Sequence, residues 1–220
     1  MKKFDPIAYK KMVKYYQDKD KPTAWFDSIY TDAQGDYTAV FWADLEPSPY
    51  LLKWLKSSVI QSTTAKAIVI GCGVGDDAEA LSEAGYQVTA FDISPEAIRL
   101  CKKRYPATTV NYLVADLFDY RSQWTAAFDL VYECNTIQVL PGKYRLQARD
   151  AMVSLLSAQG HILVSCRSRL KGQQEDDIPL PVDKDEIDGF IRAGLIEDGF
   201  ETYNDKQKPP VAHFFACYKK

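Results

Sequence analysis

The 220-residue sequence has little of what marks a metal-bound, disulfide-bonded or membrane protein. It contains only two histidines, and its five cysteines are scattered without a Cys-x-x-Cys pair. This composition predicts neither a structural metal site nor a disulfide framework. The amino end lacks the apolar stretch of a signal peptide, and no window approaches the roughly 20 apolar residues of a membrane span. We therefore expect a cytoplasmic protein with no membrane partner.

The sequence also lacks the excess of positive charge that nucleic-acid binding requires. The net charge is −3, and the one basic stretch is a group of lysines near the amino end. Such a run is the usual composition of a solvated helix face. With 46% hydrophobic and 26% charged residues, the chain has the composition of an ordinary globular protein with one sizeable core. We expect no nucleic-acid partner, and a monomer or weak homodimer.

The chain is organised around the stretch from Lys66 to Asp77, which reads KAIVIGCGVGDD. Its β-branched run predicts a strand buried on both faces, and the three glycines that follow predict a turn. Apolar residues then recur at helical spacing, with Asp76 or Asp77 placed to cap the helix. Strand, glycine turn and helix form the first half of a nucleotide-binding unit. Glycine adopts positive φ readily and lets a ligand approach the backbone.

The spacing of the glycines separates two kinds of ligand. A dinucleotide loop requires a third glycine where this sequence has Asp76, and a carboxylate there would repel a diphosphate. The stretch resembles the first motif of the class I S-adenosylmethionine-dependent methyltransferases. In that family the loop passes beside the methionine part of the cofactor, and a nearby acid favours its amino group. The resemblance implies that S-adenosylmethionine is bound by Gly71, Cys72, Gly73, Gly75 and Asp76.

Two further strand ends extend this resemblance. Asp92 ends a predicted strand about 20 positions beyond the glycines, where a carboxylate holds a ribose diol. Ile93 follows it and is expected beside the cofactor. Asp116 and Leu117 follow the next predicted strand and match the family position near the adenine amino group. The resemblance thus assigns four more cofactor-binding residues.

The ends of the fourth and fifth predicted strands supply the candidates for chemistry. In the family, the fourth strand reaches the methyl group and the substrate, so Glu133 is our candidate both for cofactor contact and for a general base. A contact with a neighbouring backbone group is the alternative for this carboxylate. Asn135, Gln138 and Arg167 are candidate substrate contacts, although an arginine at a strand end is often an ion-pair residue. His213, in the last strand, is expected to be packed rather than catalytic.

These motifs predict an α/β fold with a doubly wound, seven-stranded, mostly parallel sheet whose last strand is antiparallel. The methyltransferase core would occupy residues 61–220, after a helical extension and lid at 1–60. The aromatic and proline-rich run of the extension also resembles thiopurine and thiol/halide methyltransferases. Packing is favoured for Trp25, whereas Trp42 fits packing and a lid contact with substrate equally well. Further patterns predict a short helix over 50–55, a polar linker over 57–64, strands over 87–91, 109–115, 128–133, 161–165, 196–204 and 212–218, and a helix over 183–193.

Three functions remain compatible with the sequence. The first is S-adenosylmethionine-dependent methyl transfer to a small-molecule acceptor, and the second is a nicotinamide-dependent oxidoreductase. The third is a non-catalytic module that binds S-adenosylmethionine, since a cofactor loop does not by itself create a substrate pocket. Asp76 and the pair Asp116-Leu117 count against the second. The acceptor atom, whether sulfur, oxygen, nitrogen or halide, is left open.

Overall fold

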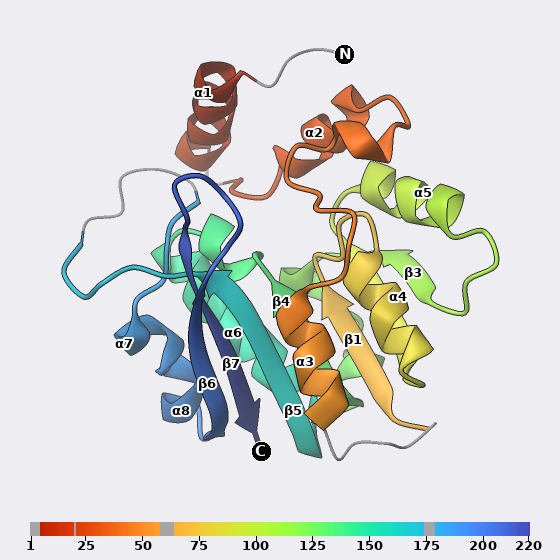
Figure 1. The fold of residues 1–220 in the computed structure, drawn as a ribbon, viewed down its shortest axis with the longest axis vertical. Coiled ribbons are helices and arrows are strands. Elements are labelled where there is room, and N and C mark those ends of the chain that lie inside the picture. The colour runs from red at the N-terminus through yellow and green to blue at the C-terminus, as the bar shows by residue number, and fades with distance from the viewer. Residues whose placement is uncertain (1–4, 20, 58–63, 174–178) are drawn as a thin grey trace.

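The computed structural model describes residues 5–19, 21–57, 64–173 and 179–220, which form a seven-stranded sheet flanked by helices (Figure 1). The strands are β1 (Lys66–Ile70), β2 (Gln87–Asp92), β3 (Asn111–Val114), β4 (Phe128–Cys134), β5 (Leu156–Arg167), β6 (Ile196–Asn204) and β7 (Ala212–Lys219). Their order in the sheet is β3-β2-β1-β4-β5-β7-β6, and β7 pairs antiparallel with β5 and β6 whereas every other pair is parallel. The predicted doubly wound sheet with an antiparallel last strand is therefore confirmed.

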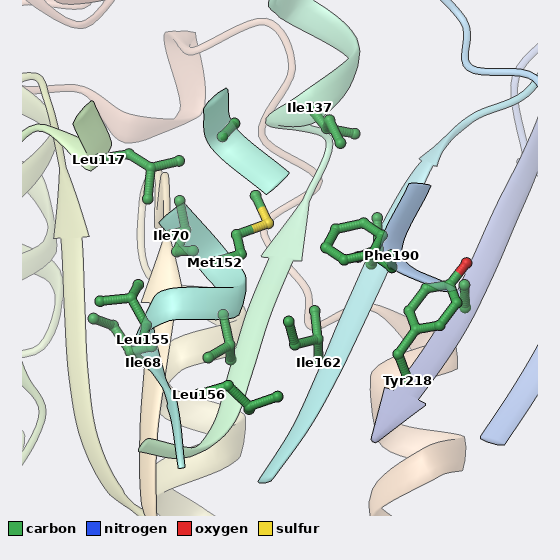
Figure 2. Packing of buried hydrophobic residues seen from close by; sticks show 14 of the residues in the cluster. Ile68, Ile70, Leu117, Ile137, Met152, Leu155, Leu156, Ile162, Phe190 and Tyr218 are labelled. Carbon is green, nitrogen blue, oxygen red and sulfur yellow. The ribbon is translucent and has the colours of Figure 1, made fainter. Parts of the chain in front are cut away.

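Alternating side chains of the strands build a core on each face of the sheet. Ile68 and Ile70 of β1 face one cluster, which includes Met152 of α6 (Gly142–Leu155) (Figure 2). The short helices α7 (Lys184–Ile187) and α8 (Gly189–Arg192) cover the same face. Ala67 and Val69 face the opposite cluster, with α3 (Pro49–Ser57), α4 (Asp76–Glu83) and α5 (Pro95–Arg104). A strand buried on both faces needs the continuous apolar run that the sequence supplies.

The amino-terminal segment lies above the carboxyl ends of the parallel strands (Figure 1). It contains α1 (Pro6–Asp18), α2 (Phe26–Asp32) and the 3-10 turn η1 (Tyr37–Ala39), and we call the described part of residues 5–48 the cap. Asp5 caps α1 by accepting hydrogen bonds from the backbone N–H groups of Ile7 and Ala8. The cap packs on α5, where Tyr30 and Ala33 meet Ala97 and Leu100. The cap therefore covers the edge of the sheet at which the sequence predicts ligand binding.

The predicted helix near residues 50–55 is α3, and it belongs to the sheet layer. Leu51 is fully buried against the strands. The predicted polar linker from Ser57 to Thr64 lies largely outside the described residues. Within the described ranges, no helix is long and apolar enough to cross a membrane.

Local predictions fail where tertiary contacts decide the outcome. Gly75, with φ of 98°, is the N-cap residue of α4, so the predicted cap by Asp76 or Asp77 is wrong. Strand β5 begins at Leu156 rather than at residue 161, because its first residue already pairs with Phe128 of β4. The segment 183–193, predicted as one helix, forms the two short helices α7 and α8. The capping pattern at Asp183 is nevertheless present.

Candidate active site

The glycine loop joins β1 to α4 at the carboxyl edge of the sheet. Gly71, Gly73 and Gly75 have φ of 62°, 55° and 98°, a region that residues with side chains rarely adopt. A Cβ atom on Gly71 would lie 2.5 Å from Thr136 Oγ1, and one on Gly75 would lie 2.5 Å from the Tyr112 hydroxyl. Both glycines are therefore required by the turn and by neighbouring side chains, before any ligand is considered.

Cys72 and Asp92 tie this loop to the adjacent strand. The backbone N–H of Cys72 donates to the carbonyl of Phe91 at 3.0 Å. Asp92 is 6% exposed and accepts from the N–H of Gly73 at 3.1 Å and from that of Ser94 at 2.9 Å. Burial raises the pKa of the Asp92 carboxyl to about 6, although these backbone hydrogen bonds act in the opposite direction. Each carboxylate oxygen has a second lone pair, so Asp92 can still accept from ligand hydroxyls.

Two cap residues that the sequence analysis did not identify complete this part of the site. The hydroxyl of Tyr30 lies 3.4 Å from the position of a Cβ on Gly73, and Tyr30 is 3% exposed. The carboxylate of Asp27 accepts from Ser94 Oγ at 2.6 Å. The cap is thus bonded to the turn after β2 and covers the middle of the glycine loop. Both residues belong to α2, and nothing in the local pattern of that helix marks them.

A cavity of about 380 Å³ lies between the cap and the ends of β2 and β3. Its volume is within the range of small-molecule sites. Two predicted residues line it, Ile93 and Asp116, and the other lining residues are Lys21, Pro22, Thr23, Ala24, Asp27, Phe118 and Tyr144. Asp116 is held by a hydrogen bond that its Oδ1 accepts from Phe118 N at 2.8 Å.

The side chain of Leu117 points away from the cavity. Its side chain is 7% exposed and belongs to the apolar core, whereas the neighbouring Phe118 lines the cavity. The short 3-10 turn η2 (Leu117–Asp119) turns the two side chains in different directions. A cofactor contact at Leu117 would therefore use its backbone.

Asp76 also differs from its predicted role. Its carboxylate forms a bidentate ion pair with Arg104 of α5, with both N–O distances at 2.6 Å and both side chains 13% exposed. The carboxylate is thus turned toward α5, whereas the prediction places it beside the amino group of a ligand. The next acid, Asp77, accepts from Ser48 N and from the Tyr132 hydroxyl. These two residues hold α4 to its neighbours.

Glu133, at the end of β4, is fully buried rather than open to the ligand edge. Its Oε2 accepts from the N–H groups of Thr136 and Ile137 at 2.9 and 3.1 Å, whereas its Oε1 is buried without a partner among the described residues. Burial raises the pKa of this carboxyl to about 8. The carboxyl predicted as a general base is therefore shielded by the surrounding protein. The alternative, a contact with neighbouring backbone groups, describes the observed position.

Of the three predicted substrate contacts at the strand ends, the structure leaves Asn135 and Arg167 available. Asn135 is exposed, with φ of 63°, and its N–H donates to the carbonyl of Ser165 in β5 at 2.7 Å. Gln138 is 5% exposed, and its Oε1 accepts from the backbone N–H of Arg167. Gln138 therefore positions the end of β5, a role that the sequence did not predict.

Trp42 lies within an aromatic cluster of the cap that also contains Trp25, Phe26 and Phe41. Its ring packs edge-on against Phe41 at 4.6 Å and Trp25 at 6.0 Å, and its Nε1 donates to the Tyr30 hydroxyl at 3.3 Å. Trp25 is 1% exposed and stacks on Phe26, which confirms its predicted packing role. The contacts of Trp42 favour packing over direct contact with substrate.

Arg167 and His213 are paired across β5 and β7 at the same edge. His213 is 5% exposed and stacks on Tyr203 with ring centroids 5.0 Å apart. Its Nδ1 lies 2.9 Å from the carbonyl of Val211, and because a carbonyl only accepts, Nδ1 carries the proton. Nε2 forms no hydrogen bond within the described chain and is not among its buried unpartnered nitrogens, so it retains contact with solvent. His213 is both packed and able to accept a proton.

The part of the chain that carries these motifs is similar to a known protein family. Residues 67–160 match the family model of the methyltransferase domain, a range that contains the glycine loop, Asp92 and Asp116. This match supports a class I S-adenosylmethionine-dependent methyltransferase domain in that part of the chain. The finer likeness to thiopurine and thiol/halide methyltransferases is not confirmed.

Similar proteins set this domain in context. The chain is 26% identical over 167 residues to the ubiquinone biosynthesis O-methyltransferase of Xylella fastidiosa (strain M23), covering 74% of this chain and 65% of the relative's length. The 1,6-didemethyltoxoflavin-N1-methyltransferase of Burkholderia thailandensis has a TM-score of 0.66 and 16% identity, covering all of this chain and 92% of that one. The [4+2]-cyclase SpnF also has a TM-score of 0.66, with 12% identity, covering 78% of this chain and 80% of that one. At these identities the structural similarities show a common fold.

Proposed function

We propose that the methyltransferase domain binds S-adenosylmethionine along the carboxyl ends of β1, β2 and β3. We further propose that it transfers the methyl group to a small-molecule acceptor at the ends of β4 and β5. The observation that carries this proposal is the alignment of three features on one sheet edge: the glycine loop, the buried carboxylate of Asp92 and the cavity beside Asp116. Ligands of open α/β sheets bind at this edge.

The residues present fit the cofactor in polarity and in size. Asp92 would accept hydrogen bonds from the ribose hydroxyls, since its oxygens have spare lone pairs and its position is fixed by two backbone N–H groups. Ile93 and Phe118 would contact the adenine ring, with the Asp116 carboxylate near its amino group. The backbone of the glycine loop would lie beside the methionine part.

The protein's contribution to methyl transfer would be to place the acceptor and to exclude water. Bound S-adenosylmethionine supplies an electrophilic methyl group. Alignment of the two reactants can lower the barrier by roughly 7 to 11 kcal/mol. The cap, bonded through Asp27 and resting on the glycine loop through Tyr30, is the part of the chain placed to keep the site dry.

An oxygen acceptor is favoured by the activity named for the Xylella relative, and a hydroxyl acceptor must lose a proton. Because Glu133 is buried, we assign this task to Nε2 of His213. The hydrogen bond from Nδ1 to Val211 fixes the ring so that Nε2 has the free lone pair. Burial lowers the pKa of the His213 imidazole, which keeps the ring neutral at physiological pH.

A second candidate function keeps the cofactor site but not the methyl transfer. It is favoured by the fold shared with the cyclase SpnF, because the same sheet can serve other chemistry. Incubating the full chain with S-adenosylmethionine and a panel of catechols, phenolic acids, amines, thiols and halides separates the two. We expect S-adenosylhomocysteine to form with at least one hydroxylated acceptor. A protein that binds S-adenosylhomocysteine but turns over no acceptor would support the second function instead.

A further inference from the structure

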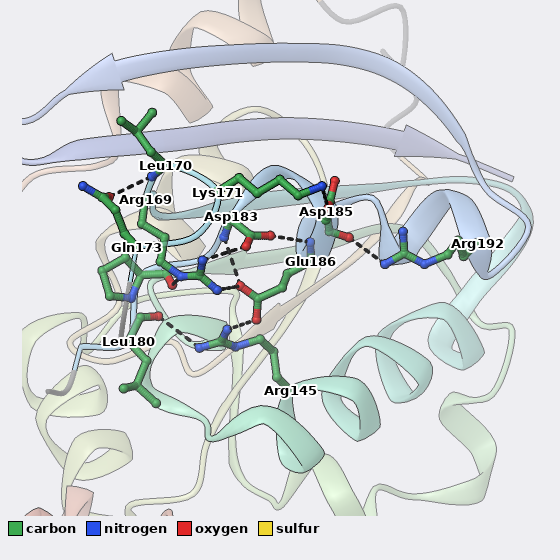
Figure 3. A network of polar contacts seen from close by, with 11 residues as sticks. Arg145, Arg169, Leu170, Lys171, Gln173, Leu180, Asp183, Asp185, Glu186 and Arg192 are labelled. Carbon is green, nitrogen blue, oxygen red and sulfur yellow. Dashed lines mark hydrogen bonds and ion pairs between the residues drawn. The ribbon is translucent and has the colours of Figure 1, made fainter. Parts of the chain in front are cut away.

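Arg167 differs from the other arginines at its end of the sheet because it has no acidic partner among the residues that the structure describes. Arg145 and Arg169 both pair with Glu186, and Arg169 also pairs with Asp183 at 2.6 Å (Figure 3). Arg167 is half-buried, yet its guanidinium forms no ion pair or hydrogen bond in the described parts of the chain. An unpaired charge that is partly removed from water is costly, so this position calls for a negatively charged ligand.

The backbone of Arg167 is fixed even though its side chain is unpaired. Its N–H donates to Gln138 Oε1, and its carbonyl accepts from Val182 N at 2.9 Å. Both contacts fix the backbone of Arg167 at the end of β5. The guanidinium is therefore presented from a rigid position and takes no part in holding the fold together. Such pre-organisation is typical of residues that bind a ligand.

Two ring-bearing side chains, Tyr9 and His213, interact with Arg167 or lie beside it in the sheet. Burial raises the pKa of the Tyr9 hydroxyl in α1 to about 12, and the positive charge of Arg167 opposes that shift. The ring of Tyr9 meets Trp25 and Phe41 edge-on, each at 5.4 Å, so it belongs to the aromatic cluster of the cap. Across the strand pair, Arg167 lies beside His213. The guanidinium of Arg167 is thus within electrostatic range of an aromatic side chain of the cap.

We propose that the methyl acceptor is an apolar acid, whose carboxylate pairs with Arg167 and whose body packs against the aromatic cluster of the cap. This inference rests on the proposed function and specifies its substrate class. A guanidinium presents two parallel N–H donors that match the two oxygens of a carboxylate. Aromatic side chains provide flat apolar surface for the rest of the molecule. Neutral analogues of the same shape would leave Arg167 unpaired.

The test uses small probes on the full chain with S-adenosylhomocysteine bound. Benzoate and phenylacetate are titrated against benzamide and phenylacetamide, which have nearly the same shape without the charge. We expect each acid to bind at least tenfold more tightly than its amide, and tenfold corresponds to about 1.4 kcal/mol. Arg167→Gln should abolish this preference, and Arg167→Lys should retain part of it. The matched control is Arg192→Gln, which removes an exposed arginine from α8 and should leave the preference intact.

The outcomes separate this inference from the function on which it rests. Equal binding, or no binding, of acids and amides to the wild-type complex would overturn the acidic acceptor while S-adenosylhomocysteine binding still supports the cofactor site. An acid preference that survives intact in folded Arg167→Gln would overturn the assignment of Arg167. Failure of the wild-type chain to bind S-adenosylhomocysteine would instead count against the proposed function. Should Arg167→Gln not fold, the wild-type comparison and Arg167→Lys decide the question.

Discussion

Replacing Glu133 by glutamine tests the electrostatics of the buried strand end. The carboxyl is fully buried, and its pKa is raised from 4.5 to about 8 by burial. Between these two values the native state retains a proton that the unfolded state has released. Stability therefore falls as pH rises through this window, by about 1.4 kcal/mol per pH unit. Once pH exceeds the native pKa, the accumulated loss is about 5 kcal/mol.

The Glu133→Gln variant should lack this pH-dependent loss. The glutamine oxygen can still accept from Thr136 and Ile137, whereas its amide group would occupy the unpartnered position of Oε1. An unpaired buried amide costs about 1 to 3 kcal/mol, so the variant should be less stable than the wild type at pH 5. It should equal or exceed the wild type at pH 9.

The assay is urea unfolding of both proteins at several pH values from 5 to 9, with Glu83→Gln as the control. Glu83 is exposed on α4, so the same chemical change there should leave the pH dependence of the wild type unaltered. Parallel stability curves for the wild type and Glu133→Gln would refute the argument from burial. If acceptor turnover collapsed in a stable Glu133→Gln variant, the carboxyl would have to reach the substrate after all.

Three further substitutions test individual contacts. Asp92→Asn removes the charge that accepts hydrogen bonds from the ribose hydroxyls, and such bonds contribute about 1.5 to 3 kcal/mol each. The affinity for S-adenosylhomocysteine, measured by calorimetry, should therefore fall at least about tenfold. Unchanged affinity in a folded variant would remove Asp92 from that role. Trp42→Ala should lower the free energy of unfolding by about 3 kcal/mol through lost aromatic packing, with acceptor KM measured alongside; a large KM change without loss of stability would restore the contact with substrate. Asp76→Asn should destabilise the fold by about 2 kcal/mol, because Arg104 loses its charged partner, and cofactor affinity should stay unchanged. A loss of cofactor affinity without a loss of stability would return Asp76 to the cofactor site.

The sheet and the cofactor edge could be predicted because both follow from local patterns. Apolar runs bounded by turns fix the strands, and residues that directly follow parallel strands must meet at one edge. Asp92 and Asp116 are found there for this reason. The inward turn of Glu133 is also implicit in the sequence, since strand alternation puts it on the same face as the buried Val131.

Other parts of the site depend on contacts between distant segments. The pairing of Asp76 with Arg104 joins residues 28 positions apart, and no local pattern specifies it. Asp27 and Tyr30 enter the site only because the cap folds over the sheet edge. The side chain of Gln138 is drawn inward because the end of β5 offers an N–H that needs an acceptor. Such positions require the tertiary arrangement.

The most direct test of the cofactor site is a calorimetric titration of the full chain with S-adenosylhomocysteine and, separately, with NADH. The geometry of the glycine loop, Asp92 and the adjoining cavity predicts one site per chain for S-adenosylhomocysteine and no binding of NADH. Binding of NADH to a folded chain that ignores S-adenosylhomocysteine would contradict the account.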